Sequence, residues 1–228
     1  MAVFHRRQHL GKDYFMEHVL DVKKLVNELT LEEKASLCSG ADFWHTKAID
    51  RLNIPAAMVS DGPHGIRKQE SLADHMGVAE SIKAIGFPTA SAMACSFDRD
   101  LLHKVGDALG EECVAEDLAV LLGPGINMKR SPICGRNFEY YSEDPVVAGE
   151  LGAAFVNGVQ EHGVGTSLKH FAANNQEWRR MSISAEIDER TLREIYLAAF
   201  ETVVKKAQPW TIMCSCLLYT SDAADEAR

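Results

Sequence analysis

The sequence predicts an α/β protein with the architecture of a (β/α)8 TIM-type barrel that is incomplete at its carboxyl end. Short apolar runs alternate with segments of helical periodicity, which is typical of parallel βα units. Polar residues follow directly after these runs, as they do at the carboxyl ends of barrel strands. A doubly wound open sheet is the alternative, but the chain contains no G-x-G-x-x-G phosphate turn.

The elements follow from local patterns in chain order. Apolar residues recur at helical spacing from Met16 to Leu29. Thr30 then begins a capping box with Glu33 three residues on, and this box opens a short helix through Leu37. Strands are expected over 56–60, 118–122, 164–168 and 210–213, and helices over 99–115, 145–162 and from Asp188 onward.

The composition argues against several classes of function. The 228 residues carry a formal net charge of −9, which disfavours a nucleic-acid partner because phosphate backbones attract clustered Lys and Arg. No apolar run is long enough to span a bilayer, and the first twelve residues lack the features of a secretory signal. We therefore expect no membrane partner and a cytoplasmic location. The six cysteines form no CxxC pair, which favours free thiols.

Four polar clusters stand where strands are expected to end. They cover residues 60–67, 123–139, 169–180 and 213–215, and they combine carboxylates, amides and cationic side chains. A sugar ring explains this mixture, because its hydroxyls both donate and accept hydrogen bonds. A carboxylate such as Asp61 can accept from two adjacent hydroxyls, while Arg and Lys side chains donate to the others.

Four motifs in these clusters resemble, in the same order, those of family 3 glycoside hydrolases. Each motif alone is weak, whereas the ordered set is specific and covers about Leu29 to Ser215. The motifs are Asp61-Gly62-Pro63-His64-Gly65-Ile66-Arg67, Leu122-Gly123-Pro124-Gly125-Ile126-Asn127, Cys134-Gly135-Arg136-Asn137-Phe138-Glu139 and Lys169-His170-Phe171, with Tyr141-Ser142-Glu143-Asp144-Pro145 as a fitting spacer.

The resemblance implies a pocket for the non-reducing terminal sugar of a β-linked glucoside or oligosaccharide. Asp61 would bind the hydroxyls farthest from the scissile bond, Lys169 and His170 would hold ring hydroxyls beside it, and Met213 would form part of the wall. No cofactor and no metal ion is expected, since the remaining histidines show no metal-ligand spacing. The full set of implied pocket residues is Asp61, Arg67, Arg136, Lys169, His170, Arg180 and Met213.

The resemblance also implies a retaining mechanism, in which an Asp attacks the anomeric carbon and a separate Glu protonates the leaving oxygen. The nucleophile is expected in a Ser-Asp-Trp motif one βα unit beyond 213–215, so neither carboxylate is expected within this chain. Cys216 stands where the family pattern has Tyr, and Cys216 to Glu226 resembles a translated transposon-type sequencing adapter. Ser221-Asp222 imitates the nucleophile motif, but Ala223 replaces Trp and the spacing is too short.

These considerations divide the chain into three segments. Residues 1–15 are an unassigned leader, residues 16–215 are a partial family 3 N-terminal barrel domain, and residues 216–228 are a tail foreign to the native protein. The fragment by itself is expected to be inactive.

Taken singly, the same residues have simpler interpretations. Asp61 alone would be read as a turn residue before Gly62-Pro63, and Arg136 with Glu139 as an exposed pair of little energetic value. His170 alone would be read as a packed, hydrogen-bonded histidine. Lys169 at a strand end also fits the Schiff-base lysine of an unrelated barrel aldolase. Only the joint pattern favours sugar binding over each of these.

The expected function of the parent enzyme is hydrolysis of terminal non-reducing β-D-glucosyl residues. A β-xylosidase or another exo-β-glycosidase of the family is the alternative, because the sequence does not fix the contacts around the hydroxymethyl group. An N-acetylglucosaminidase is disfavoured, since Ala172-Ala173-Asn174 follows Phe171 where those enzymes carry Pro-Gly-His. The alternative of another class is a catalytically dead sugar-binding fragment.

Overall fold

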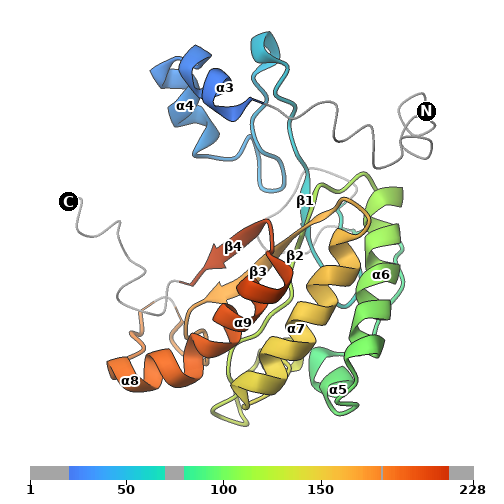
Figure 1. The fold of residues 1–228 in the computed structure, drawn as a ribbon, viewed down its shortest axis with the longest axis vertical. Helices are drawn as coiled ribbons and strands as arrows, with labels where there is room; N and C mark the ends of the chain where they lie inside the picture. The colour runs from blue at the N-terminus through green and yellow to red at the C-terminus, as the bar shows by residue number, and fades with distance from the viewer. Residues whose placement is uncertain (1–20, 70–79, 181, 216–228) are drawn as a thin grey trace. The chain divides into compact units, whose positions relative to one another are not determined.

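The computed structural model describes residues 21–69, 80–180 and 182–215 (Figure 1). The predicted leader 1–15, the start of the first predicted helix and the predicted tail 216–228 lie outside the described residues. The chain divides into two compact units, one of Met1–Asp42 with Thr46–Ala56 and the other of Phe43–His45 with Ala57–Arg228. Among the described helices, none is long and apolar enough to cross a membrane.

The described part of the first unit contains the short helices α3 (Val22–Glu28) and α4 (Leu31–Leu37) and the 3-10 turn η1 (Asp50–Leu52). The predicted capping box of α4 is confirmed. The Thr30 hydroxyl accepts a hydrogen bond from the Glu33 N–H at 3.2 Å, and the Glu33 carboxylate accepts one from the Thr30 N–H at 2.8 Å. These two bonds satisfy backbone donors that the first turn of a helix leaves free, and they fix where α4 begins.

The second unit is built on a four-stranded parallel sheet whose strands lie in sequential order. Right-handed crossovers between sequential parallel strands place all connecting helices on the same face. This order is that of a segment of a (β/α)8 barrel, whereas a doubly wound sheet reverses its strand order. The α/β class is confirmed, and closure into eight strands stays a prediction. The strands are β1 (Val59–Asp61), β2 (Val120–Leu122), β3 (Gly165–Phe171) and β4 (Thr211–Cys214) (Figure 1).

Three helices connect these strands and pack side by side, α6 on α7 and α7 on α9 (Figure 1). The helix predicted over 99–115 is confirmed to the residue, and the other two fall within their predicted segments. The short elements α5 and η2 carry no helical periodicity of their own and were not predicted. The three connecting helices are α6 (Arg99–Ala115), α7 (Pro145–Gln160) and α9 (Ala198–Ala207); the short elements are α5 (Ala90–Ala94) and the 3-10 turn η2 (Asn137–Glu139).

The helix predicted from Asp188 contains a wide turn that the apolar spacing does not indicate. Asp188 caps α8 (Glu189–Thr191), and a π-helical turn, η3 (Leu192–Tyr196), separates α8 from α9. An extra residue in a turn shifts the helical phase. Within this turn, the hydroxyl of the buried Tyr196 accepts a hydrogen bond from Arg130 Nε at 3.0 Å, while α9 contributes apolar side chains to the core.

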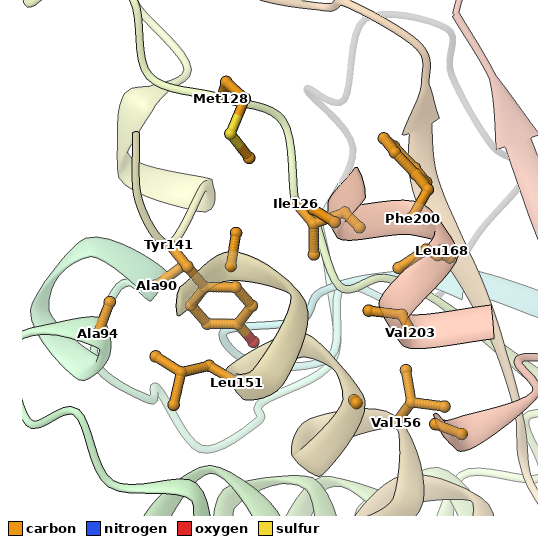
Figure 2. Packing of buried hydrophobic residues seen from close by; sticks show 14 of the residues in the cluster. Ala90, Ala94, Ile126, Met128, Tyr141, Leu151, Val156, Leu168, Phe200 and Val203 are labelled. Atoms are coloured by element: carbon orange, nitrogen blue, oxygen red, sulfur yellow. The ribbon is translucent and has the colours of Figure 1, made fainter. Parts of the chain in front are cut away.

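Two apolar clusters hold the second unit together. In the first, Leu168 of β3 packs with Val156 of α7 and with Phe200 and Val203 of α9 (Figure 2). The second cluster joins the sheet to α6 and α7 through Leu121, Leu109, Phe155 and Val159, all of which are fully buried. Each such side chain contributes roughly 1.5–3 kcal/mol of transfer free energy. The sheet therefore rests on α7, which contributes to both clusters.

The contact between α6 and α7 depends on a close approach at Gly158. A Cβ atom at this position would lie 2.2 Å from the His103 carbonyl oxygen and 2.7 Å from the Asp107 nitrogen. Both neighbours are backbone atoms of α6, so a larger side chain cannot be accommodated by a rotamer change. Only separation of the two helices would make room.

We therefore expect Gly158→Ala to lower the free energy of unfolding of the chain by about 1–2 kcal/mol. Overpacking costs roughly 1–3 kcal/mol, and the better helix propensity of Ala returns up to about 1 kcal/mol. The midpoint of urea unfolding, followed by far-ultraviolet circular dichroism, measures the change. Gly86→Ala is the matched control, because no atom lies within 4 Å of its Cβ position. Equal midpoints for both variants would contradict the close approach of the helices.

Candidate functional site

The ends of three parallel strands bring the predicted polar clusters together. Asp61 at the end of β1 pairs in register with Leu122 of β2, and Lys169 of β3 pairs with Met213 of β4. The chain after β2 continues beside β3, because the Ile126 N–H donates to the Lys169 carbonyl at 2.9 Å. The first, second and fourth motifs therefore meet at one edge of the sheet, as the strand order requires.

Six charged side chains at this edge form a chain of alternating sign. Lys169 Nζ donates to Asp61 Oδ1 at 2.6 Å and lies 3.6 Å from Glu139 Oε2. Arg136 Nε donates to the other oxygen of Glu139. Three acids and three bases in this order leave the edge with no formal net charge. The remaining links are Arg136 Nη1 to Glu177 Oε1 at 3.8 Å and Arg180 Nη1 to Glu177 Oε2 at 3.2 Å.

Glu139 occupies the centre of this charge chain, and only 5% of the residue is exposed. The interpretation of Arg136 and Glu139 as an exposed surface pair is therefore wrong. Burial lowers the pKa of Arg136, but the hydrogen bond with Glu139 and the nearby negative charge outweigh burial, so the net shift is upward. A carboxylate buried between two cations holds both in place, since leaving either unpaired in a low dielectric is costly.

His170 lies next to the charge chain and is connected on both sides of its ring. Arg136 Nη2 lies 2.8 Å from His170 Nε2, and the Tyr140 hydroxyl lies 3.2 Å from His170 Nδ1. Asn174 Nδ2 donates to the same hydroxyl at 2.8 Å. Burial, and then the positive charges of Arg136, Lys169 and Arg180, lower the pKa of His170 to about 2. The ring is therefore neutral at ordinary pH.

The backbone of His170 is fixed by a single buried side chain. Asn127 Nδ2 donates to the His170 carbonyl at 2.9 Å, and Asn127 Oδ1 accepts from the His170 N–H at 2.9 Å. An amide side chain can make both bonds at once, in the manner of a neighbouring strand. The last residue of the second motif thus sets the position of the fourth.

The predicted pocket residues differ in how closely the structure connects them. Asp61, Arg136, Lys169, His170 and Arg180 all belong to the connected set described above. Met213 joins it through its register with Lys169. Arg67 joins it through its backbone N–H, which donates to the Asp61 carbonyl at 3.0 Å, while its side chain is exposed.

Several residues of the connected set were not predicted as site residues. Tyr140, Asn174, Glu177 and Asn127 all lie inside or directly beside the polar clusters over 123–139 and 169–180. His64 also belongs here, since burial lowers its pKa, with Lys169 adding to the effect and Glu139 opposing it. Their positions inside or next to the polar clusters were the signal that could have identified them.

The arrangement can bind neighbouring hydroxyl groups. Lys169 is almost fully buried, whereas 38% of the Asp61 side chain is exposed, so the charge chain presents the Asp61 carboxylate to solvent with its cationic partner buried behind it. Within the part of the chain that the structure describes, no group of three or more His, Cys, Asp or Glu side chains could hold a metal ion.

Comparisons with known proteins agree with these features. The family model described as Glycosyl hydrolase family 3 N terminal domain matches residues 23–227. A thermostable β-glucosidase B of Acetivibrio thermocellus is 60% identical over 196 residues, which are 86% of this chain and 26% of that protein. An exo-α-(1→6)-L-arabinopyranosidase of Bifidobacterium longum is 56% identical over 191 residues, which are 83% of this chain and 25% of that protein.

Solved structures show the same relationship. The family 3 β-glucosidase of Bifidobacterium adolescentis has a TM-score of 0.77 and 55% identity, with 83% of this chain and 27% of that chain covered. The β-glucosidase of Kluyveromyces marxianus, solved in complex with glucose, has a TM-score of 0.81 and 44% identity, with 86% and 23% covered. The chain thus spans about a quarter of the length of these relatives. From the matched range and these similarities, the chain belongs to glycosyl hydrolase family 3, in the N-terminal domain of that family.

Proposed function

We propose that the parent protein of this chain hydrolyses terminal non-reducing β-D-glucosyl residues by a retaining mechanism. The observation that carries the proposal is the charge chain at the strand ends, which offers acceptors and donors in alternation. A sugar ring presents adjacent hydroxyls that need both, and charge-assisted hydrogen bonds are the strong ones. Relatives named as β-glucosidases support the choice of glucose.

In this proposal the pocket residues have distinct tasks. Asp61 accepts hydrogen bonds from two hydroxyls far from the scissile bond, and Lys169 and Arg136 donate to hydroxyls beside them. His170 lies beside the same sugar ring. Arg67 and Arg180 contribute positive charge at the rim of the pocket, and Met213 forms part of the pocket wall. Glu139 binds no sugar and instead holds Lys169 and Arg136 in position.

The structure favours this function over a Schiff-base aldolase. An amine that attacks a carbonyl needs a free lone pair. The Lys169 ammonium instead donates to Asp61 at 2.6 Å and lies 3.6 Å from Glu139. This geometry suits a lysine that positions a ligand.

An exo-acting glycosidase for pentopyranosides is the second candidate. It is supported by two relatives named as exo-α-(1→6)-L-arabinopyranosidases, each 56% identical to this chain. A pentopyranose differs from glucose in lacking the hydroxymethyl group, and β-xylosidase activity belongs to the same candidate. The sugar released from a panel of aryl glycosides separates it from the first proposal.

We place the catalytic nucleophile and the acid/base outside residues 16–215. The three carboxylates of the described charge chain are all paired with cations, which suits ligand positioning and not proton donation to a leaving group. We further propose that residues 216–228 are foreign to the native domain. This boundary rests on the departure from the family pattern at Cys216, and the family model itself matches as far as residue 227.

The parent protein is expected to release glucose from aryl β-glucosides with β-glucose as the first product. Two successive displacements at the anomeric carbon restore the original configuration. Proton NMR of the reaction mixture at early times shows which anomer forms first. Initial α-glucose would exclude the retaining mechanism, and faster release of xylose or arabinose would favour the second candidate.

Asp61→Asn in the parent protein is expected to lower kcat/KM by several orders of magnitude. The amide cannot accept charge-assisted bonds from two hydroxyls, and it leaves the buried Lys169 with one anionic partner fewer. Asp100→Asn, on the exposed surface of α6, is the matched control and should keep the wild-type kcat/KM. A loss of kcat/KM below about tenfold for Asp61→Asn, about 1.4 kcal/mol, would show that Asp61 acts only as a turn residue.

The 228-residue chain alone is expected to release no glucose from an aryl β-glucoside. It retains the groups proposed to bind sugar, but we place the groups that attack and protonate elsewhere. A chromogenic assay with purified chain measures this directly. Turnover that Asp222→Ala abolishes would show that the tail supplies a nucleophile and would overturn the proposed boundary at 215.

A further inference from the structure

The His170 ring is held between two groups that determine where its proton lies. Its Nε2 atom is 2.8 Å from Arg136 Nη2, and a guanidinium nitrogen can only donate a hydrogen bond. Nε2 must therefore accept, and an accepting imidazole nitrogen carries no proton. A neutral ring has one N–H, so the proton resides on Nδ1, where the Tyr140 hydroxyl accepts it at 3.2 Å.

We propose that Arg136 and Tyr140 lock His170 in the Nδ1–H tautomer, so that toward a bound sugar His170 acts only as a hydrogen-bond acceptor. Tyr140 is in this view a positioning residue, which acts through His170 without touching the sugar. Burial and three neighbouring cations lower the pKa of His170 to about 2, so protonation of Nε2 does not release the lock at ordinary pH.

Tyr140 is well placed to enforce the tautomer because it cannot move. The residue is fully buried, and its hydroxyl accepts a second hydrogen bond from Asn174, which is itself buried. Its ring lies against Gly125, where a Cβ atom would come within 3.0 Å of two ring carbons. A glycine of the second motif therefore leaves room for the ring that holds the histidine of the fourth.

The other components of the ring's surroundings are equally fixed. Asn127 clamps the His170 backbone through two hydrogen bonds of 2.9 Å. Arg136 is held by the buried Glu139 and lies 3.8 Å from Glu177. The ring can neither flip nor shift without breaking several bonds at once, so a single tautomer is maintained.

The lock has a consequence for sugar recognition, which rests on the proposed function. Nε2 has one lone pair, which Arg136 occupies at 2.8 Å, so a sugar hydroxyl can bond to His170 only by donating to Nε2 in place of Arg136, and the ring offers it no proton. Fluorine can replace a hydroxyl as a weak acceptor but not as a donor. At the ring position that faces His170, a fluoro sugar should therefore bind as poorly as a deoxy sugar.

The tautomer is tested without any catalytic assay, by nitrogen-15 NMR of histidine-labelled 228-residue chain. We expect the His170 signals, assigned by loss in His170→Gln, to show a protonated Nδ1 and an unprotonated Nε2 from about pH 4 to about pH 8. A proton on Nε2, or titration of His170 within that range, would overturn the proposal.

Tyr140→Phe tests the part assigned to the tyrosine. It removes the acceptor of Nδ1–H and keeps the ring, so the His170 signals should shift toward a mixture of tautomers or toward ionisation within the same pH range. Tyr141→Phe is the matched control, since Tyr141 packs in the apolar cluster with Leu151 and should leave the signals of His170 unchanged (Figure 2). Unchanged signals in Tyr140→Phe would show that the tyrosine has no such role.

The consequence for recognition is tested in the parent protein with glucose and its monodeoxy and monodeoxyfluoro analogues as competitive inhibitors. We expect one ring position at which fluorine and hydrogen weaken inhibition alike, by about tenfold or more, and expect Tyr140→Phe to reduce that loss to about threefold or less. Glucose that inhibits while every fluoro analogue binds as glucose does would overturn the inference and leave the proposed function standing. A parent protein that neither hydrolyses glucosides nor binds glucose would instead overturn the function, while the NMR result would still decide the tautomer.

Discussion

The site is organised around one buried carboxylate. Glu139 lies between Lys169 and Arg136, and each of the two cations reaches further, to Asp61 on one side and to His170 and Glu177 on the other. Removing one partner of a buried ion pair typically costs roughly 3–5 kcal/mol, because the other charge is left unpaired. Glu139 therefore fixes the distance between two cations from distant parts of the chain, and the positions of Asp61 and His170 depend on it.

The order of the strands brings the partners of the Glu139 carboxylate to one place. Parallel strands in sequential order deliver their carboxyl ends to one edge of the sheet, so the loops after β1, β2 and β3 meet without long excursions. The loop after β2 carries both Asn127, which clamps His170, and Glu139, which pairs with Lys169. Behind the sheet, α7 packs on both α6 and α9 and supports the strands from which these loops depart.

Charge and hydrogen-bond geometry have different tasks in this site. The alternating ion pairs balance the formal charge, so that several ionised groups can share a partly buried edge. The neutral groups orient His170 through directional hydrogen bonds. Asn127 orients the backbone of His170, and Tyr140 with Asn174 orients the His170 ring. A site for a neutral polyol needs both, because such a ligand brings no charge of its own and is distinguished by where its hydroxyls donate and accept.

The sequence alone determined the motifs and those elements that carry a local signal, and tertiary structure decided how they act together. The capping box at Thr30 and the helix over 99–115 are local patterns, fixed by neighbours three or four residues away, and could be read directly. The hydrogen bond from Arg130 to Tyr196 in the π turn and the burial of Glu139 beside Lys169 could not, because each joins residues that are distant in the chain. For the same reason, the spacing of Arg136 and Glu139, three residues apart, suggests only a surface pair. The tertiary structure shows Lys169 and His170 in contact with them. Ionic and hydrogen-bond partners are chosen by proximity in space, and in a parallel sheet that proximity is set by the order of the strands.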